Sequence, residues 1–267
     1  MPWYGFSKEV LEFPSALITG HQLFGFVAFG FSLCNGSFRV RSVEKSQNLF
    51  LQGIMGFVKD PLAFLHVLQT VLEMTSYRII LFTAGYEPFN AAIQVIAAEH
   101  VDSIQFSEDC ISLINGRLFC FSGIYFGIVC ITLSSSTIAY NWLFPQCAAV
   151  IHHGGSGSTA AALQAGIPQV LCPFMHDQFY WAERMHWLGV APEPLRRNDL
   201  FPEANDKKSI RAAAYVLSRA INDAFSPEVK ARAAEISEKL SAEDGVLEAV
   251  ECIKKELGCL NSDTLAS

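Results

Sequence analysis

The chain has 267 residues, of which 51% are hydrophobic, and a formal net charge of −7. It is long enough to bury a core, and its acidic balance argues against a nucleic-acid binder, which usually carries a basic face. Its eight cysteines form no CxxC pair, which argues against a zinc site and favours free thiols in a reducing, cytoplasmic setting.

The first 48 residues show no clear periodicity, and we interpret them as the remnant of an interdomain region. Two apolar stretches, residues 16–34 and 118–133, are candidates for a membrane span. Polar residues interrupt the first, and the second is shorter than the roughly 20 residues that a bilayer requires. We therefore interpret both as core strand or inserted sequence.

The pattern becomes regular from residue 49 onward and predicts a domain over residues 49–258. Asp60 followed by Pro61 is typical of a helix start, since the aspartate caps the first turn and proline suits the first helical position. Apolar residues continue this helix at helical spacing. The elements expected in this half are strands at 49–51, 77–82 and 118–121 and helices after residue 60 and at 87–100.

The second half alternates strands and helices at short spacing, which indicates a parallel sheet with helical crossovers. The expected strands cover 148–151 and 169–172, and the expected helices cover 158–165 and 179–188. Gly166 and Gly189 are expected to end these two helices. From residue 209 the chain reads as helical, with a restart at Ser226-Pro227, a break at Gly245 and a last helix ending at Gly258. We expect residues 259–267 to be a disordered tail.

A glycine-rich turn follows the strand predicted at 148–151, and residues 152–159 read His-His-Gly-Gly-Ser-Gly-Ser-Thr. A strand, a glycine turn and an alanine-rich helix together present backbone N–H groups to an anion. Ser158 and Thr159 are expected to cap the helix and to donate to phosphate oxygens. His153 is expected to face the ligand, whereas His152, one residue away on a strand, should point the opposite way and serve the structure.

Two other readings of this loop fail on the sequence. An esterase would need a G-x-S-x-G nucleophile elbow, and residues 154–158 lack the final glycine. A P-loop would need a lysine before its Ser/Thr, and Gly157 stands there.

Further polar groups are expected near the same carboxyl edge of the sheet, where ligands of open parallel sheets bind. Asp177 and Gln178 follow one strand and suit sugar hydroxyls, while Trp142 and Gln146 precede another and offer a flat indole and an amide. Asp177 has the alternative of capping the helix after it, and Trp142 that of packing in the core. The combination indicates a nucleotide-sugar pocket.

The segments 141–146, 152–159 and 173–192 resemble the donor-binding signature of UDP-glycosyltransferases, in particular the plant-type sterol 3-beta-glucosyltransferases. The resemblance covers most of residues 50–255. It implies the C-terminal half of a GT-B fold, a Rossmann-like α/β domain that binds UDP-glucose without a metal or other cofactor. It also implies roles for individual residues: His153 and the loop residues Gly155, Ser156, Gly157, Ser158 and Thr159 at the diphosphate, Asp177 and Gln178 at the glucose, and Trp142 and Gln146 on the uridine side.

The chain departs from the family pattern at three points. The acceptor half, with its catalytic histidine base, is expected before Met1, so no catalytic residue is assigned here. The loop expected to read Gly-Ser-Met is Gly53-Ile54-Met55, which lacks one hydroxyl. Residues 124–136 stand where the family has almost no sequence, and we interpret them as an insertion.

The sequence therefore predicts the donor half of an inverting sterol glucosyltransferase that transfers glucose from UDP-glucose to the 3-hydroxyl of a sterol. Peripheral association with a membrane would suit such an acceptor. The alternative is a non-catalytic protein that binds a UDP-sugar or a lipid.

Overall fold

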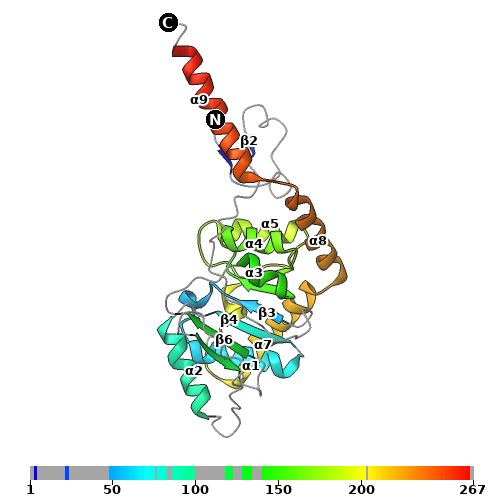
Figure 1. The fold of residues 1–267 in the computed structure, drawn as a ribbon. Coiled ribbons are helices and arrows are strands. Elements are labelled where there is room, and N and C mark those ends of the chain that lie inside the picture. Colours follow the sequence, from blue (N-terminus) through cyan, green and yellow to red (C-terminus); the bar gives the residue numbers. More distant parts are fainter. Residues whose placement is uncertain are drawn as a thin grey trace.

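The computed structural model describes residues 3–4, 22–23, 48–75, 77–82, 86–99, 118–122, 128–133, 140–202 and 204–264. A six-stranded sheet in the order β5-β6-β4-β3-β7-β8 forms its centre (Figure 1). The strands are β3 (Asn48–Leu51), β4 (Arg78–Phe82), β5 (Leu118–Ser122), β6 (Ile128–Leu133), β7 (Ala149–His152) and β8 (Gln169–Leu171). A separate pair, β1 (Trp3–Tyr4) and β2 (Gln22–Leu23), is parallel. The predicted α/β class is confirmed.

One edge of the sheet differs from the predicted all-parallel arrangement. β5 pairs antiparallel with β6, while every other pair in the sheet is parallel. Only residues 123–127 join these two strands, and a parallel connection would need a crossover of a dozen residues or more. β6 lies within the segment 124–136, so residues 128–133 of this segment contribute a strand between β4 and β5. Its origin as an insertion stays a prediction.

Helices cover both faces of the sheet, because alternate side chains along each strand point to opposite faces. Leu49 and Leu51 of β3 join a core with α1, α2 and α7, whereas Phe50 joins the core under α3 and α4. A third cluster joins α4, α5 and α8. The helices are α1 (Pro61–Met74), α2 (Glu87–Glu99), α3 (Tyr140–Leu143), α4 (Ser156–Ala165), α5 (Gln178–Trp187), α6 (Arg197–Leu200), α7 (Lys207–Ala224), α8 (Pro227–Ser241) and α9 (Gly245–Thr264), with short 3-10 turns η3 (Met55–Phe57) and η6 (Phe144–Gln146).

Helix starts follow the capping residues. The Asp60 carboxylate accepts a hydrogen bond from the Ala63 N–H at 3.0 Å, and Ser226 caps α8 in the same way. α7 begins at Lys207, ahead of the predicted residue 209, because Asp206 accepts from two backbone N–H groups of its first turn. Gly166 and Gly189 have positive φ values at the ends of α4 and α5, as predicted.

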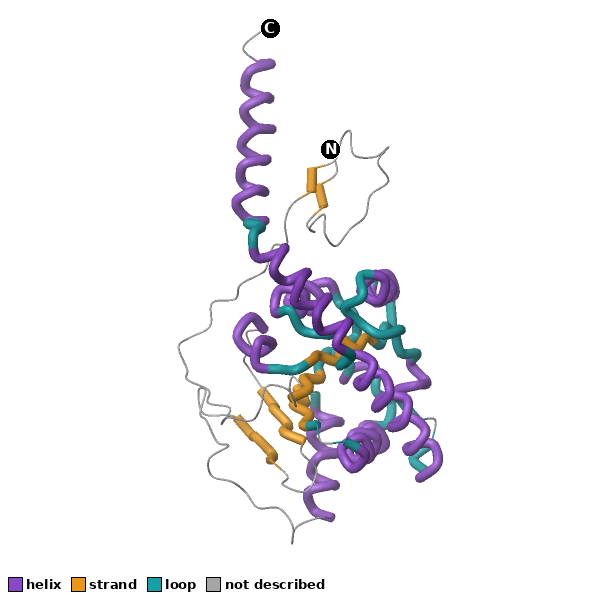
Figure 2. Tube along the Cα trace, turned by 90° about the vertical axis from the view of Figure 1, so that its right-hand side faces the viewer, coloured by secondary structure: helices purple, strands orange, loops and turns teal. Residues whose placement is uncertain are grey.

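The last helix runs further than the sequence pattern predicted. α9 continues past Gly258 to Thr264, so residues 259–264 of the expected tail are helical. A single glycine inside a helix costs only about 1 kcal/mol, and Leu260 keeps the apolar spacing of Ile253 and Leu257. Both views show α9 projecting from the body (Figure 1 and Figure 2).

Apolar runs of this chain do not form membrane-spanning helices in the described residues, where no helix has both the length and the hydropathy to cross a bilayer. The stretch 118–133 contributes strands β5 and β6 instead. Most of the stretch 16–34 lies outside the described residues. Cys147, Cys172 and Cys252 are free thiols, and the first two are buried.

Candidate functional site

Strands β3 and β7 form the point where the chain order of the sheet reverses. β4 and β7 lie on opposite sides of β3, and the helices that follow β3 and β7 pack on opposite faces of the sheet. Such a switch point leaves a crevice outside the carboxyl ends of the two strands, where ligands of open α/β sheets bind. The loops that begin at Gln52 and His153 meet there.

His153 lies between two glycines, one from each loop. A methyl group built on Gly53 would overlap the imidazole at Nδ1, and one built on Gly155 would lie 2.5 Å from Nε2. Gly53 also has a φ of +74°, which disfavours any residue with a Cβ. Only glycine therefore allows the histidine ring to occupy this place.

The His153 ring is half-buried. Its Nδ1 is buried, and no group in the described part of the chain hydrogen-bonds to it. Burial lowers the pKa of this imidazole, while the negative charge of Asp177 acts in the opposite direction. Because the ring as a whole is only half-buried, its exposed edge is suited to meet an incoming ligand.

His152 has the structural role that the sequence predicted. Its side chain is fully buried, its Nε2 lies 2.9 Å from Gln169 Oε1, and its Nδ1 accepts the Gly154 N–H at 3.1 Å. Because Nδ1 accepts, the ring proton is on Nε2 and is donated to Gln169. The neutral ring thus fixes the first turn of the glycine-rich loop.

Acid should destabilise the protein through His152. Burial lowers the pKa of this imidazole from 6.5 to about 3. Below pH 6.5 the unfolded chain binds a proton that the folded chain excludes, so the free energy of unfolding falls as the pH drops from 6.5 toward 3, by at most about 1.4 kcal/mol per pH unit. Urea unfolding between pH 7 and pH 4 measures this slope. His152→Gln should flatten it, and an unchanged slope in that variant would contradict the assignment.

The first turn of α4 supplies backbone donors. The helix begins at Ser156, with Gly155 as a cap residue that has no side chain to satisfy the first N–H groups. The first helical bond runs from the Thr159 N–H to the Gly155 carbonyl, so the N–H groups of residues 156–158 have no helical acceptor. A Cβ at Gly157 would meet no atom within 4 Å, so the helix is open to solvent at this residue.

Ser158 and Thr159 do not cap α4, contrary to the sequence-based expectation. The helix starts two positions earlier, so both residues lie inside it and both are buried. The Thr159 hydroxyl donates back to the Gly155 carbonyl at 3.0 Å. The Ser158 hydroxyl accepts from Gln52. Both hydroxyl groups are thus used inside the protein, and Ser158 and Thr159 contribute to the site only through the position of their backbone.

Gln52 links three parts of the site, and the sequence reasoning missed it. Its amide Nε2 donates to Ser158 Oγ at 2.8 Å, and its Oε1 accepts from the Tyr140 hydroxyl at 2.9 Å. The side chain is 3% exposed. One buried amide thus joins the end of β3, the first turn of α4 and the start of α3. The sequence feature that could have indicated Gln52 is its position as a polar residue directly after the apolar run of residues 49–51.

Trp142 and Gln146 lie on the short helices that precede β7. Trp142 belongs to α3, but its side chain lies outside the described part of the structure, so its role stays a prediction. Gln146 ends η6 and is half-buried. α3 and η6 pack against α4, and the Tyr140 hydroxyl bonded to Gln52 brings the start of α3 near the glycine-rich loop, whereas Gln146 lies before the amino end of β7.

Asp177 and Gln178 begin α5 on the other side of that loop. Asp177 is exposed and does not cap the helix, because its carboxylate accepts from Trp181 Nε1 at 3.1 Å instead. Gln178 is buried, and its Oε1 accepts the backbone N–H groups of Phe174 and Met175 at 2.9 and 3.1 Å. Its amide oxygen is therefore committed to the loop, and only its Nε2 is available to a sugar hydroxyl.

The start of α5 also touches the glycine-rich loop directly. A methyl group built on Gly154 would lie 3.0 Å from the Gln178 carbonyl oxygen. The site thus combines backbone donors, one half-buried histidine and an exposed carboxylate. No group of three or more His, Cys, Asp or Glu side chains that could hold a metal ion occurs in the described residues.

Comparison with known proteins gives a family match over part of the chain. Residues 134–242 match the family model "Erythromycin biosynthesis protein CIII-like, C-terminal domain". A sterol 3-beta-glucosyltransferase of Arabidopsis thaliana is 40% identical over 118 residues, which are 44% of this chain and 17% of that relative. The chain therefore spans much less than two thirds of this relative.

Solved structures match the fold more widely. The calicheamicin glycosyltransferase CalG4 superposes with a TM-score of 0.61 at 17% identity, over 96% of this chain and 52% of that one. The spinosyn rhamnosyltransferase SpnG complexed with thymidine diphosphate gives a TM-score of 0.53 at 15% identity, over 92% of this chain and 54% of that one. At these identities the likeness establishes the fold.

Proposed function

Since residues 134–242 belong to the EryCIII-like C-terminal domains of glycosyltransferases, we propose that the site at the ends of β3 and β7 binds the diphosphate of UDP-glucose. The observation that carries the proposal is the His153 ring held between Gly53 and Gly155, next to the unbonded N–H groups of α4. A helix N-terminus with free backbone donors favours phosphate oxygens, and a histidine nitrogen adds a directed hydrogen bond.

The sugar would lie toward α5. The exposed Asp177 carboxylate accepts hydrogen bonds from hydroxyl groups, and the Gln178 amide nitrogen donates to one. Trp142 and Gln146 are assigned to the uridine side by the resemblance of residues 141–146 to the family signature. The resemblance of residues 141–192 to the family signature supports this order of base, diphosphate and sugar along the edge of the sheet.

The proposed reaction is the inverting transfer of glucose to the 3-hydroxyl of a sterol. The hydroxyl oxygen attacks the anomeric carbon, the bond from that carbon to UDP breaks, and the hydroxyl proton passes to a base, which in the family belongs to the acceptor domain. This chain would stabilise the negative charge that develops on departing UDP, through the α4 amides and His153. The sterol acceptor rests on the name of the Arabidopsis relative, and peripheral contact with a membrane is part of the same proposal.

Replacing His153 with alanine tests the donor site. Loss of a hydrogen bond to a charged phosphate should weaken UDP binding by about 1–3 kcal/mol, measured by calorimetric titration. His66→Ala, which removes a histidine of α1 that pairs with Asn205, is the matched control and should leave the affinity unchanged. Equal affinities of His153→Ala and the unaltered protein would refute the site.

A second function, binding of the nucleotide sugar without turnover, is favoured by Ile54. This residue stands where the family loop carries a hydroxyl, and its side chain is fully buried in the core, so Ile54 itself offers no donor to a ligand. Incubation with UDP-glucose and a sterol separates the two functions. Formation of a steryl glucoside would exclude the non-catalytic reading.

A further inference from the structure

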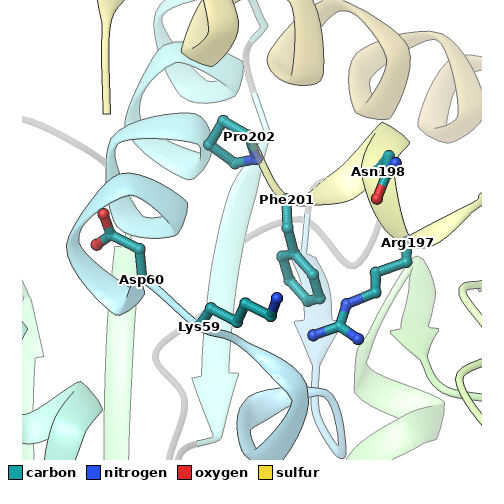
Figure 3. A pocket seen from close by; sticks show the side chains of 6 residues that line it. All are labelled: Lys59, Asp60, Arg197, Asn198, Phe201 and Pro202. Carbon is teal, nitrogen blue, oxygen red and sulfur yellow. The ribbon is translucent and has the colours of Figure 1, made fainter. Parts of the chain in front are cut away.

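A separate pocket of about 350 Å³ lies between the start of α1 and the segment around α6. Six residues line it: Lys59, Asp60, Arg197, Asn198, Phe201 and Pro202 (Figure 3). None of them belongs to the proposed donor site. Arg197 Nη2 donates to the Phe57 carbonyl at 3.1 Å, which anchors the guanidinium at the rim of the pocket. The volume falls in the range of small-molecule sites.

Two positive charges converge in this pocket. The Lys59 ammonium and the Arg197 guanidinium both point toward the ring of Phe201, whereas the Asp60 carboxylate points away from them (Figure 3). That carboxylate already accepts the Ala63 N–H. Across the described residues neither Lys59 nor Arg197 has an ion-pair partner. In a chain with a net charge of −7, two cations brought together without a carboxylate between them favour an anionic ligand.

The pocket also has a firm apolar wall. Phe201 stacks on Phe174 with ring centroids 5.6 Å apart, and Phe174 stacks on Phe57 at 4.4 Å. Phe64 of α1 meets the Phe201 ring edge to face at 5.3 Å. Aromatic neighbours on two sides restrict the Phe201 ring, so an apolar group of a ligand would meet a fixed surface.

We propose that this pocket binds a phosphate monoester whose organic part contacts Phe201. A phosphate monoester carries close to two negative charges at neutral pH and three acceptor oxygens, so it can meet Lys59 and Arg197 together while the lining carboxylate of Asp60 points away from both. Arg197 keeps further N–H donors in its planar group for phosphate oxygens, and Lys59 acts as a point charge. The ester is either a soluble metabolite or the headgroup of phosphatidic acid at a membrane surface.

The experiment titrates phenyl phosphate into the protein saturated with UDP, so that the donor site is occupied, and follows binding by calorimetry. The double variant Lys59→Gln, Arg197→Gln should bind phenyl phosphate about tenfold more weakly or worse, since both charge-assisted contacts are lost. Arg197→Lys keeps the charge but loses the planar donor group, and an intermediate affinity is expected. The double variant Arg219→Gln, Lys254→Gln removes the same charge from exposed positions on α7 and α9 and should bind as the unaltered protein does.

Vesicles distinguish the two sources of the ester. Sedimentation with phosphatidylcholine vesicles that contain phosphatidic acid, but not with pure phosphatidylcholine, identifies a lipid headgroup when Lys59 and Arg197 are required. Phenyl phosphate binding without vesicle binding identifies a soluble ester. Absence of saturable binding, or binding that the Lys59→Gln, Arg197→Gln variant retains, overturns the proposal. The His153→Ala variant should keep the pocket intact, so failure of the donor site and failure of this pocket are separate results.

Discussion

Replacement of Gly53 by alanine is expected to remove most UDP binding and to destabilise the fold by about 1–3 kcal/mol. The new methyl group would overlap the His153 ring, with Cε1 only 2.6 Å away, so the imidazole must leave its place. The backbone adds to the cost, because alanine disfavours the left-handed conformation at φ +74°. The loss of affinity should equal or exceed that of His153→Ala. Calorimetry with UDP and urea unfolding measure the two effects.

Gly56→Ala is the matched control for this substitution. Gly56 lies in the same loop, three residues further along, but a methyl group there would meet no atom within 4 Å. It should leave both UDP affinity and stability close to those of the unaltered protein. If Gly53→Ala and Gly56→Ala bind UDP equally well, the His153 ring does not depend on the space that Gly53 leaves.

Replacement of Gln52 by leucine is expected to lower the free energy of unfolding by about 2 kcal/mol or more and to weaken UDP binding. The substitution leaves the Ser158 hydroxyl without its donor and the Tyr140 hydroxyl without its acceptor, and an unsatisfied buried polar group costs roughly 1–3 kcal/mol. Binding should weaken because the first turn of α4 loses its tie to β3. Urea unfolding and UDP titration give the two quantities.

Gln69→Leu supplies the comparison. Gln69 is also buried but lies on α1, away from the loops that meet at His153. Its replacement should leave UDP affinity unchanged. Tyr140→Phe removes only one of the two Gln52 contacts and should lose less affinity than Gln52→Leu. Equal UDP affinities of the Gln52 and Gln69 variants would show that Gln52 only supports the fold.

Helix starts were predicted correctly where a single capping residue followed by proline determines the backbone conformation. Asp60 before Pro61 and Ser226 before Pro227 begin helices as expected, since capping and the fixed φ of proline are local effects. The alternation of His152 and His153 across a strand also predicted which ring is buried. These features depend on neighbours in the chain alone.

Contacts between residues that are far apart in the chain could not be predicted from the sequence. The hydrogen bond between Gln52 and Ser158 joins residues 106 positions apart in the sequence. The two glycines that flank the His153 ring, Gly53 and Gly155, come from two different loops. α4 begins at Ser156, two residues before the predicted start, because Gly155 and not a serine occupies the cap position. A glycine cap has no side chain to bond the first N–H groups of α4, so these groups stay available, and the usual preference for serine at helix caps does not predict this.

The thiol of Cys172 can report on movements of β8, the edge strand of the sheet next to the site. This thiol directly follows β8, in the segment that leads to Asp177, and burial raises its pKa to about 12. An alkylating reagent therefore modifies it only when that edge opens, whereas the half-buried Cys252 of α9 is a less protected reference. The ratio of the two modification rates reports how often the edge opens, and a change of this ratio with UDP would report an effect of the nucleotide on that opening.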